Sequence, residues 1–112
     1  MSEKLIRANY KEIAHILEEK AAEDIVALDM RRYTSIFDYM VICSATSRKH
    51  TQALAYALKE RMKVRHIEGY EVAEWILVDC TDVIVHIFSQ GKREYYGLEY
   101  LWSDVPRKRL CR

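Results

Sequence analysis

The stretch Trp75-Ile-Leu-Val-Asp-Cys-Thr-Asp-Val-Ile-Val-His-Ile-Phe88 contains two apolar segments joined by a short polar turn. Trp75–Val78 and Val83–Phe88 are rich in β-branched and aromatic residues, which favour strands, and Asp79–Asp82 supplies turn residues. We therefore predict a β-hairpin at the centre of a sheet. The two strands lack the regular alternation of a sheet with one solvated face, so both faces should be covered, one by helices and the other by a different element or a partner.

Three segments around this hairpin have the apolar spacing of amphipathic helices. The first covers residues 3–21. The second follows Ser47, whose hydroxyl suits a helix N-cap, and is expected to end near Val64. The third spans residues 93–102, where Tyr95, Leu98 and Trp102 recur at helical spacing. These segments are expected to supply the helical layer of the fold.

Two further apolar segments, 24–29 and 39–43, are expected to be strands, and residues 65–74 an irregular connection. The element order is then α-β-β-α-β-β-α. The simplest architecture is an α+β two-layer domain, in which a four-stranded mixed sheet has its helices mainly on one face. If the strand at 39–43 runs parallel to the strand that begins at Trp75, the helix between them should form a right-handed crossover. Residues 1–102 are predicted to form one domain.

Charge is nearly balanced over the 112 residues, with 18 basic and 17 acidic side chains and a formal net charge of +1. This balance gives no overall attraction to nucleic acid or to an anionic membrane. Residues 103–112 are more basic, because Arg107, Lys108, Arg109 and Arg112 face only Asp104. We expect a flexible, solvated C-terminal tail, with contact to RNA phosphates as the alternative.

The three cysteines have neither the spacing of a zinc site nor the pattern of a disulfide framework. Cys43 lies in an apolar segment and is expected to be a small core residue. We therefore predict no metal and no cofactor. The sequence contains no apolar stretch of membrane-spanning length and no secretory leader pattern, so the cytoplasm is the expected location.

Two enzymatic interpretations are weak. The segment Ser44–Ser47 joins a strand to a helix and could hold a phosphate, with Asp79 and Asp82 on a nearby strand end as magnesium ligands. This loop has no glycine, however, and the two carboxylates are separated by a turn. His86 has no adjacent nucleophile and is more typical of a hydrogen-bonded core histidine. We predict that the chain is not an enzyme.

The aromatic residues raise the opposite possibility, a binding surface. Tyr95, Tyr96, Tyr100 and Trp102 occupy more than one side of the short third helix, which is more than a single buried stripe can absorb. Trp75 is either a core residue or an interface anchor. Because both faces of the hairpin are apolar, we favour the interface.

With these residues in view, the chain resembles the Iojap family of ribosomal silencing factors. The motifs that carry the resemblance span most of residues 5–102 in a specific order: Asp24–Asp29, Asp38–Ser47, Glu68-Gly69, Trp75–Asp79, Asp82–Phe88 and Arg93–Trp102. Two positions depart from the family pattern. Thr81 stands where a glycine usually precedes the second turn carboxylate, and Ala73-Glu74 where a glycine often precedes the tryptophan. Thr81 predicts a turn that avoids a positive φ at that position.

The resemblance implies a nucleotidyltransferase-like topology without catalytic residues. It also implies a translation repressor that binds the large ribosomal subunit through its protein fourteen, at the intersubunit face. Such a protein blocks subunit joining under nutrient limitation and tends to form a homodimer when free. A direct RNA-binding scaffold is the alternative, and a nucleotide-binding enzyme is a weaker one. The scaffold would act through the basic tail together with Arg31, Arg32, Arg48 and Lys49.

We assign the partner contact to the hairpin and to the neighbouring part of the third helix. The carboxylates would meet basic groups on the ribosomal protein, and the aromatic residues would be buried against it. The predicted partner-binding residues are Trp75, Asp79, Cys80, Asp82, His86, Phe88, Tyr96, Glu99 and Trp102.

Overall fold

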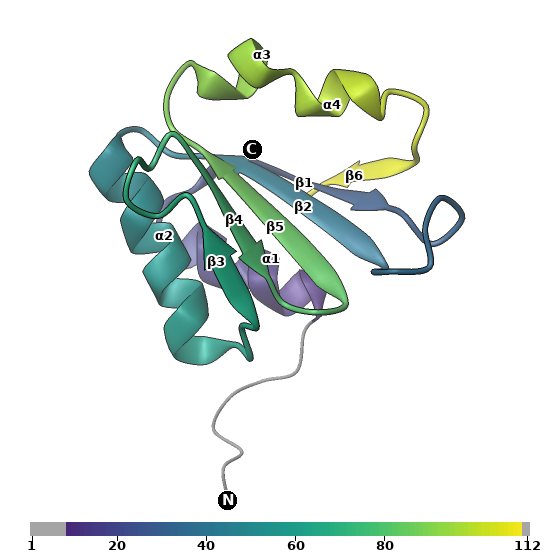
Figure 1. Cartoon of the computed structure of the whole chain (residues 1–112), viewed down its shortest axis with the longest axis horizontal. Helices are drawn as coiled ribbons and strands as arrows, with labels where there is room; N and C mark the ends of the chain where they lie inside the picture. Colours follow the sequence, from purple (N-terminus) through teal and green to yellow (C-terminus); the bar gives the residue numbers. More distant parts are fainter. Residues whose placement is uncertain (1–8, 111–112) are drawn as a thin grey trace, which may run out of the picture.

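The computed structural model describes residues 9–110, which fold around a six-stranded mixed sheet (Figure 1). The strand order across the sheet is β3-β4-β5-β2-β1-β6. The strands are, in chain order, β1 (Glu23–Asp29), β2 (Tyr39–Ser44), β3 (His66–Glu68), β4 (Trp75–Asp79), β5 (Val83–Phe88) and β6 (Arg107–Arg109).

The predicted hairpin of β4 and β5 lies inside this sheet. The two strands are antiparallel, with Trp75 opposite Phe88 and Leu77 opposite His86. On its other side β5 pairs in parallel with β2, where His86 is opposite Ile42. The strands β2 and β4 are therefore antiparallel to each other, and the condition for the expected crossover between them is not met.

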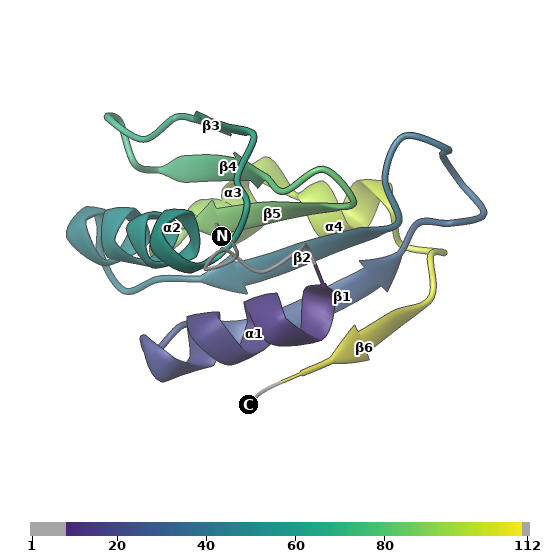
Figure 2. The ribbon, with the colours of Figure 1, turned by 90° about the horizontal axis from the view of Figure 1, so that it is seen from below.

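The helices α1 (Tyr10–Glu19) and α2 (Arg48–Arg61) pack against one face of the sheet, which we call the helix face. In Figure 2 both helices lie in front of the strands. The sheet residues that point towards them are buried, and include Ile25, Val41, Val85 and Ile87. Burial of this continuous apolar layer supplies most of the driving force for folding.

The opposite face, which we call the open face, is only partly covered. The short helices α3 (Lys92–Tyr96) and α4 (Leu98–Leu101) lie across one end of it, behind the strands in Figure 2. A smaller buried cluster forms there, in which Leu98 and Trp102 pack against Ile42 and Phe88. The chain itself thus supplies part of the second cover that the sequence requires.

The prediction of an α+β fold with a mixed sheet is confirmed, but the predicted four strands and the predicted element order are wrong. The two additional strands are β3 and β6, each three residues long and at opposite edges of the sheet. Neither has an alternating apolar pattern, because edge strands this short contribute few side chains to the core. The two long helices, α1 and α2, share one face as expected, whereas the short helices α3 and α4 lie on the other.

Two of the predicted helix boundaries are corrected and one is confirmed. Within the described residues the first helix begins at Tyr10, with Asn9 as its N-cap, and the predicted segment 3–8 lies outside the described residues. Ser47 is the N-cap of α2, as predicted, because its Oγ accepts a hydrogen bond from the His50 amide at 3.0 Å. The predicted third helix is split at Gly97, whose φ of 60° lies in the left-handed region.

The expected flexible tail also differs from the structure. β6 pairs in antiparallel fashion with β1, and the Arg109 guanidinium contacts the Asp24 carboxylate at 2.9 Å. Main-chain hydrogen bonds tie this segment to the sheet, including one from the Leu110 amide to the Ile25 carbonyl at 2.7 Å. The basic segment is therefore an edge strand as far as residue 110.

The turn between β4 and β5 contradicts the prediction for Thr81, whose φ is 73°. The Thr81 amide donates to the Asp79 carboxylate at 2.8 Å, and the Asp82 amide donates to the Cys80 carbonyl at 2.9 Å. These bonds close a tight turn that requires the left-handed conformation. A β-branched residue adopts that conformation at a cost, so Thr81 is locally strained.

Candidate protein-binding surface

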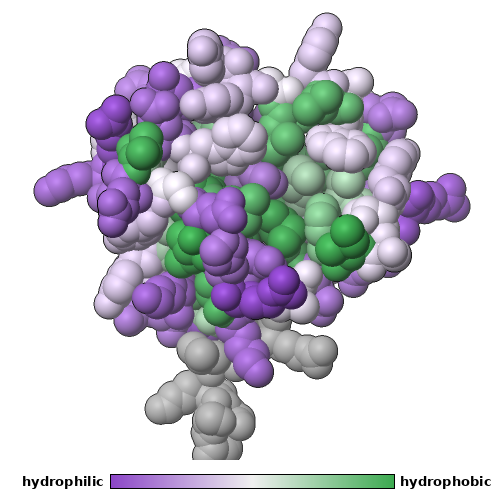
Figure 3. Space-filling model, in the orientation of Figure 1, coloured by the Kyte–Doolittle hydropathy of each residue, from purple (hydrophilic) through white to green (hydrophobic). Residues whose placement is uncertain are grey.

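An apolar surface remains uncovered on the open face, beside the α3–α4 segment. We call it the Trp75 patch; it consists of the half-buried Trp75, Leu77 and Ile84, with the buried Met40 and His86 beside them, and comes from three adjacent strands. Figure 3 shows a broad hydrophobic area over the middle of the sheet in this region. A shallow hollow of about 360 Å³ adjoins the patch and is lined by Glu68, Gly69, Trp75 and Leu77.

Trp75 is held in a defined orientation although it is only half-buried. Its indole Nε1 donates to His86 Nδ1 at 2.9 Å. Its ring centroid lies 5.0 Å from that of Phe88 and 4.8 Å from that of Tyr96. One edge of the ring is therefore fixed, while part of the ring stays accessible.

His86 is the polar residue of the patch and is 5% exposed. Leu77 and Ile42 are its cross-strand neighbours. Burial among these groups disfavours the charged imidazolium and lowers the pKa of His86 to about 4. The histidine is therefore neutral at physiological pH, as its acceptance of the Trp75 hydrogen bond requires.

An acidic group lies at the turn end of the same face. Asp79 follows Trp75 and Leu77 at alternate positions of β4, so its side chain points to the same side of the sheet. Its carboxylate lies 3.7 Å from the Arg65 guanidinium and accepts from the Thr81 amide at 2.8 Å. Asp82 directly precedes β5, is half-buried, and lines a hollow with Asn9 and Tyr10 at the start of α1. Asp79 is thus the carboxylate that borders the apolar patch.

Two residues predicted to contact a partner lie in the interior. Cys80 is 1% exposed and belongs to the cluster on the helix face, where burial raises the pKa of its thiol to about 12. Phe88 is fully buried beneath Trp75 and Tyr96. Neither side chain is available at the surface, so their direct contact with a partner is not supported. Alternation in a strand could not reveal this, because nearly all neighbouring residues are apolar.

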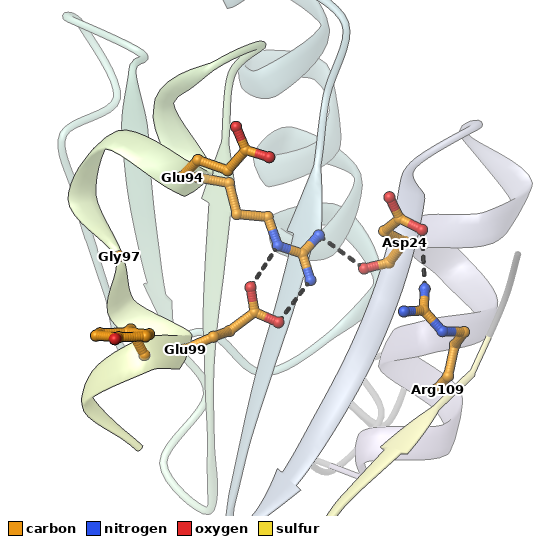
Figure 4. A pocket seen from close by; sticks show the side chains of 7 residues that line it. Asp24, Glu94, Gly97, Glu99 and Arg109 are labelled. Atoms are coloured by element: carbon orange, nitrogen blue, oxygen red, sulfur yellow. Dashed lines mark hydrogen bonds and ion pairs between the residues drawn. The ribbon is translucent and has the colours of Figure 1, made fainter. Parts of the chain in front are cut away.

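The predicted residues of the third helix lie at the other end of the open face. Glu99 is held by Arg93, whose Nε and Nη2 donate to its two carboxylate oxygens at 2.8 and 3.0 Å. Arg93 also donates to the Asp24 carbonyl and to Ser44 Oγ, which ties α4 to β1 and β2. Figure 4 shows Glu99 and Asp24 on facing sides of the pocket that this arginine lines. The Arg93 contacts lower the pKa of Glu99. Glu99 is therefore engaged within the chain.

The aromatic residues of α3 and α4 divide into two groups. Tyr96 and Trp102 pack towards the sheet, whereas Tyr95 is 74% and Tyr100 86% exposed. The expectation that one buried stripe cannot absorb all of them is confirmed. Tyr96 and Trp102 border the Trp75 patch, which brings them together with Trp75 and His86.

Three residues of the patch were not predicted to be part of a site. Met40, Leu77 and Ile84 are ordinary apolar strand residues, and nothing in the sequence separates them from the core. Their shared face follows only from the register, in which Ile84 is opposite both Asp79 and Met40. The signal that could have found them is the run of apolar residues at successive positions, which makes both faces of these strands apolar.

Comparison with known proteins identifies the family. The sequence profile described as "Ribosomal silencing factor during starvation" matches residues 3–111. The chain belongs to this family of ribosomal silencing factors.

Similar relatives extend over most of the chain. A protein of Bacillus subtilis named "Ribosomal silencing factor RsfS" is 44% identical over 94 residues, which are 80% of this chain and 80% of the relative. The protein of the same name from Halalkalibacterium halodurans is 41% identical over 99 residues, 84% of this chain and 85% of the relative. A crystal structure of a Bacillus halodurans protein superposes with a TM-score of 0.79 at 37% identity, and covers 90% of this chain and 96% of that one.

The nucleotide site that we considered is not assembled in this silencing factor. Ser44 lies opposite Phe88 at one end of the parallel pair, whereas Asp79 is opposite Ile84 near the other end. The expectation that these carboxylates lie near the Ser44–Ser47 loop is therefore wrong. Among residues 9–110 no group of three or more potential side-chain ligands gathers to hold a metal ion. Within the same residues, no helix has the length and apolar character needed to cross a membrane.

Proposed function

We propose that this chain binds the large ribosomal subunit through its protein fourteen, at the face where the small subunit docks. Binding there blocks subunit joining and represses translation when nutrients are scarce. The protein acts in the cytoplasm, and it acts by occupying a surface, not by making or breaking covalent bonds. The observation that carries this proposal is the Trp75 patch, an apolar surface that this silencing factor leaves uncovered on its open face.

The physical requirement for such a role is modest. A standard protein interface buries about 800 Å² on each partner, and a few aromatic residues near its centre dominate the affinity. Trp75 meets the description of such an anchor, because it is large, partly accessible and fixed by a hydrogen bond. Tyr96 and Trp102 extend the apolar contact, while Asp79 provides an acidic group at the edge for basic side chains of the partner.

Replacement of Trp75 by alanine tests the proposal. Trp75→Ala should weaken binding to purified large subunits by about 2 kcal/mol, roughly thirtyfold in Kd, in a sedimentation assay. The same variant should lose the ability to reduce the fraction of joined ribosomes in a gradient. Circular dichroism should report a folded domain.

Tyr56→Ala is the matched control, because Tyr56 is an aromatic residue on α2 that is 53% exposed on the opposite side of the sheet. It should bind like the parent chain. Equal affinities of the two variants would contradict the assignment of the open face. Unfolding of Trp75→Ala would show that Trp75 is a core residue and would remove it from the contact.

Direct RNA binding through residues 103–112 is the second candidate, and the structure weakens it. Arg109 is paired with Asp24, and Arg107 donates to the main-chain carbonyl groups of Val105 and Trp102. RNA binding would weaken steeply with salt, whereas an apolar protein contact would not. The double variant Arg32→Gln with Lys108→Gln should leave ribosome affinity within about twofold, and a tenfold loss would favour RNA.

The Trp75 patch also provides a reason for self-association of the free protein. We propose that free copies form a homodimer that covers this apolar surface, because exposed apolar patches of this kind favour association. Analytical ultracentrifugation should then detect a dimer that Trp75→Ala weakens. A monomer at all concentrations would remove this part of the proposal.

A further inference from the structure

His86 has a second ring nitrogen whose role the fold does not explain. Nδ1 accepts from the Trp75 indole at 2.9 Å, and within residues 9–110 the His86 side chain makes no other hydrogen bond. Because a neutral imidazole carries one N–H, the proton must be on Nε2 when Nδ1 is the acceptor. The Trp75 contact thus fixes the tautomer, and Nε2–H is a donor without a partner among the described residues.

The surroundings of this donor make it significant. His86 is 5% exposed, and it lies between Leu77 and Ile42 in neighbouring strands of the open face. No fully enclosed side-chain nitrogen or oxygen of the described residues lacks a hydrogen-bond partner, so Nε2 keeps a small access to solvent. In the free protein, water can therefore satisfy Nε2–H through a narrow opening in an apolar surface.

A docked protein would close that opening. Burial of an N–H without an acceptor costs about as much as a lost hydrogen bond, which would reduce the affinity substantially. A partner surface that is apolar throughout is therefore a poor fit to the Trp75 patch. The fitting partner has an acceptor oxygen at one point inside an otherwise apolar contact.

The charge of that acceptor is also constrained. A carboxylate near Nε2 would stabilise the imidazolium form, in which both ring nitrogens are donors. Nδ1–H would then face the Trp75 indole N–H, and the bond that orients the tryptophan would be lost. An uncharged acceptor, such as a main-chain carbonyl oxygen, preserves both the tautomer and the Trp75 orientation.

We propose that His86 is a specificity-determining residue of the Trp75 patch, whose Nε2–H donates to an uncharged acceptor oxygen on the docked ribosomal protein. This inference rests on the proposed function, and it adds the chemistry that the partner must present. The His86 ring then has two roles: Nδ1 orients Trp75, and Nε2–H donates a hydrogen bond to the partner.

A double-variant cycle separates these two roles. The Kd for isolated large-subunit protein fourteen is measured by calorimetry for the parent chain, Trp75→Phe, His86→Phe and the double variant. If His86 only orients the indole, His86→Phe has no further effect once Trp75→Phe has removed the indole N–H. We expect the Kd to rise about tenfold between Trp75→Phe and the double variant, because the partner's acceptor is left unpaired. A change of less than about twofold would overturn the proposal.

The unmodified protein provides an independent measurement. Two-dimensional ¹⁵N–¹H spectra of the histidine rings should show His86 of the free protein as the Nε2–H tautomer. In the complex, Nε2–H should exchange more slowly with solvent. An Nδ1–H tautomer, or unchanged exchange on binding, would overturn the proposal even if the His86→Phe variants fail to fold.

The pH dependence of binding tests the charge of the acceptor. With an uncharged acceptor, the change in Kd between pH 7 and 5 should be the same for the parent chain and for His86→Phe, because free His86, with a pKa of about 4, is still neutral at pH 5. Tighter binding at pH 5 by the parent chain but not by His86→Phe would indicate a carboxylate and would overturn the proposal. One result would separate the two proposals: no binding of the parent chain to protein fourteen at any pH, together with the Nε2–H tautomer of His86 in the free protein. The proposed function would then be wrong, whereas the His86 geometry would be correct.

Discussion

The two faces of the sheet have similar amino-acid compositions but different environments. The helix face is covered by α1 and α2, and its side chains, such as Ile25, Val85 and Ile87, are completely buried. The open face has a smaller cluster under α3 and α4, and it leaves the Trp75 patch uncovered. Apolar character therefore has two purposes here: on one face it stabilises the fold, and on the other we propose that it binds a partner.

The largest difference between the faces should appear when a leucine is truncated on each. Leu54 of α2 is fully buried on the helix face, and Leu54→Ala should lower the free energy of unfolding by about 4 kcal/mol. Leu77 is half-buried on the open face, and Leu77→Ala should cost about 1 kcal/mol. Urea denaturation measures both. Equal losses would mean that the open face is as important for stability as the helix face.

Acid should destabilise the open face through His86. The pKa of this residue is about 4 in the folded protein, below its ordinary value of 6.5, so below pH 6.5 the unfolded chain binds a proton that the folded chain excludes. The contribution of His86 to the free energy of unfolding is fully present above pH 6.5 and decreases as the pH falls towards 4. Between pH 7 and 5 the loss should be about 2 kcal/mol.

The variant His86→Gln is the control for this pH dependence, because glutamine can accept from Trp75 but does not titrate. The difference in unfolding free energy between pH 7 and 5 should be about 2 kcal/mol smaller in the variant. Parallel stability curves of the two proteins would show that His86 is protonated as easily when folded as when unfolded.

Arg93→Met should loosen the cover at one end of the open face. Arg93 joins α4 to β1 and β2, and its side chain is 15% exposed. Its loss leaves the Glu99 carboxylate without its partner, and should cost about 1.5 kcal/mol and increase hydrogen exchange in α3 and α4. Arg48→Met is the control, because Arg48 is 67% exposed in its pair with Glu74 and should contribute little. Unchanged hydrogen exchange in Arg93→Met would mean that Tyr96 and Trp102, and not Arg93, hold α3 and α4 against the sheet.

The smallest effect concerns the turn beside the Trp75 patch, and it is stabilising. Thr81 has a φ of 73°, so Thr81→Gly should relieve strain and raise the free energy of unfolding by about 1 kcal/mol. Ser35→Gly, at an exposed loop position without a positive φ, should not stabilise the protein. Thermal unfolding compares the two. A loss of stability in Thr81→Gly would mean that the threonine side chain contributes more than its backbone costs.

The predictions from sequence succeeded where local chemistry decides the outcome. The β4–β5 hairpin follows from its β-branched residues, and the start of α2 follows from the Ser47 hydroxyl. The edge strands β3 and β6 were missed because their side chains are mostly exposed, and what defines them is main-chain pairing with a neighbour. The Thr81 conformation was predicted wrongly for a similar reason, since hydrogen bonds of the whole turn override the preference of one residue.

The partner-binding site stays a prediction, but the structure shows which of its predicted residues lie near the surface. Trp75, His86, Tyr96 and Trp102 come together on or beside the open face, whereas Cys80 and Phe88 are interior. The sequence cannot distinguish the surface residues from the interior ones. In a strand that is apolar on both faces, alternation shows which residues share a face but not which face is covered. Which side is covered depends on helices that are distant in the chain.

The amino-acid sequence by itself determined the family, the α+β class and the need for cover on both faces of the central hairpin. These properties follow from local patterns of apolar and turn residues, which are written along the chain. The tertiary structure decided which face the helices take, how the strands are aligned, and therefore which apolar residues stay accessible. The physical reason is that exposure depends on contacts between segments far apart in sequence, and the hydrophobic effect depends on area covered, not on the identity of the element that covers it.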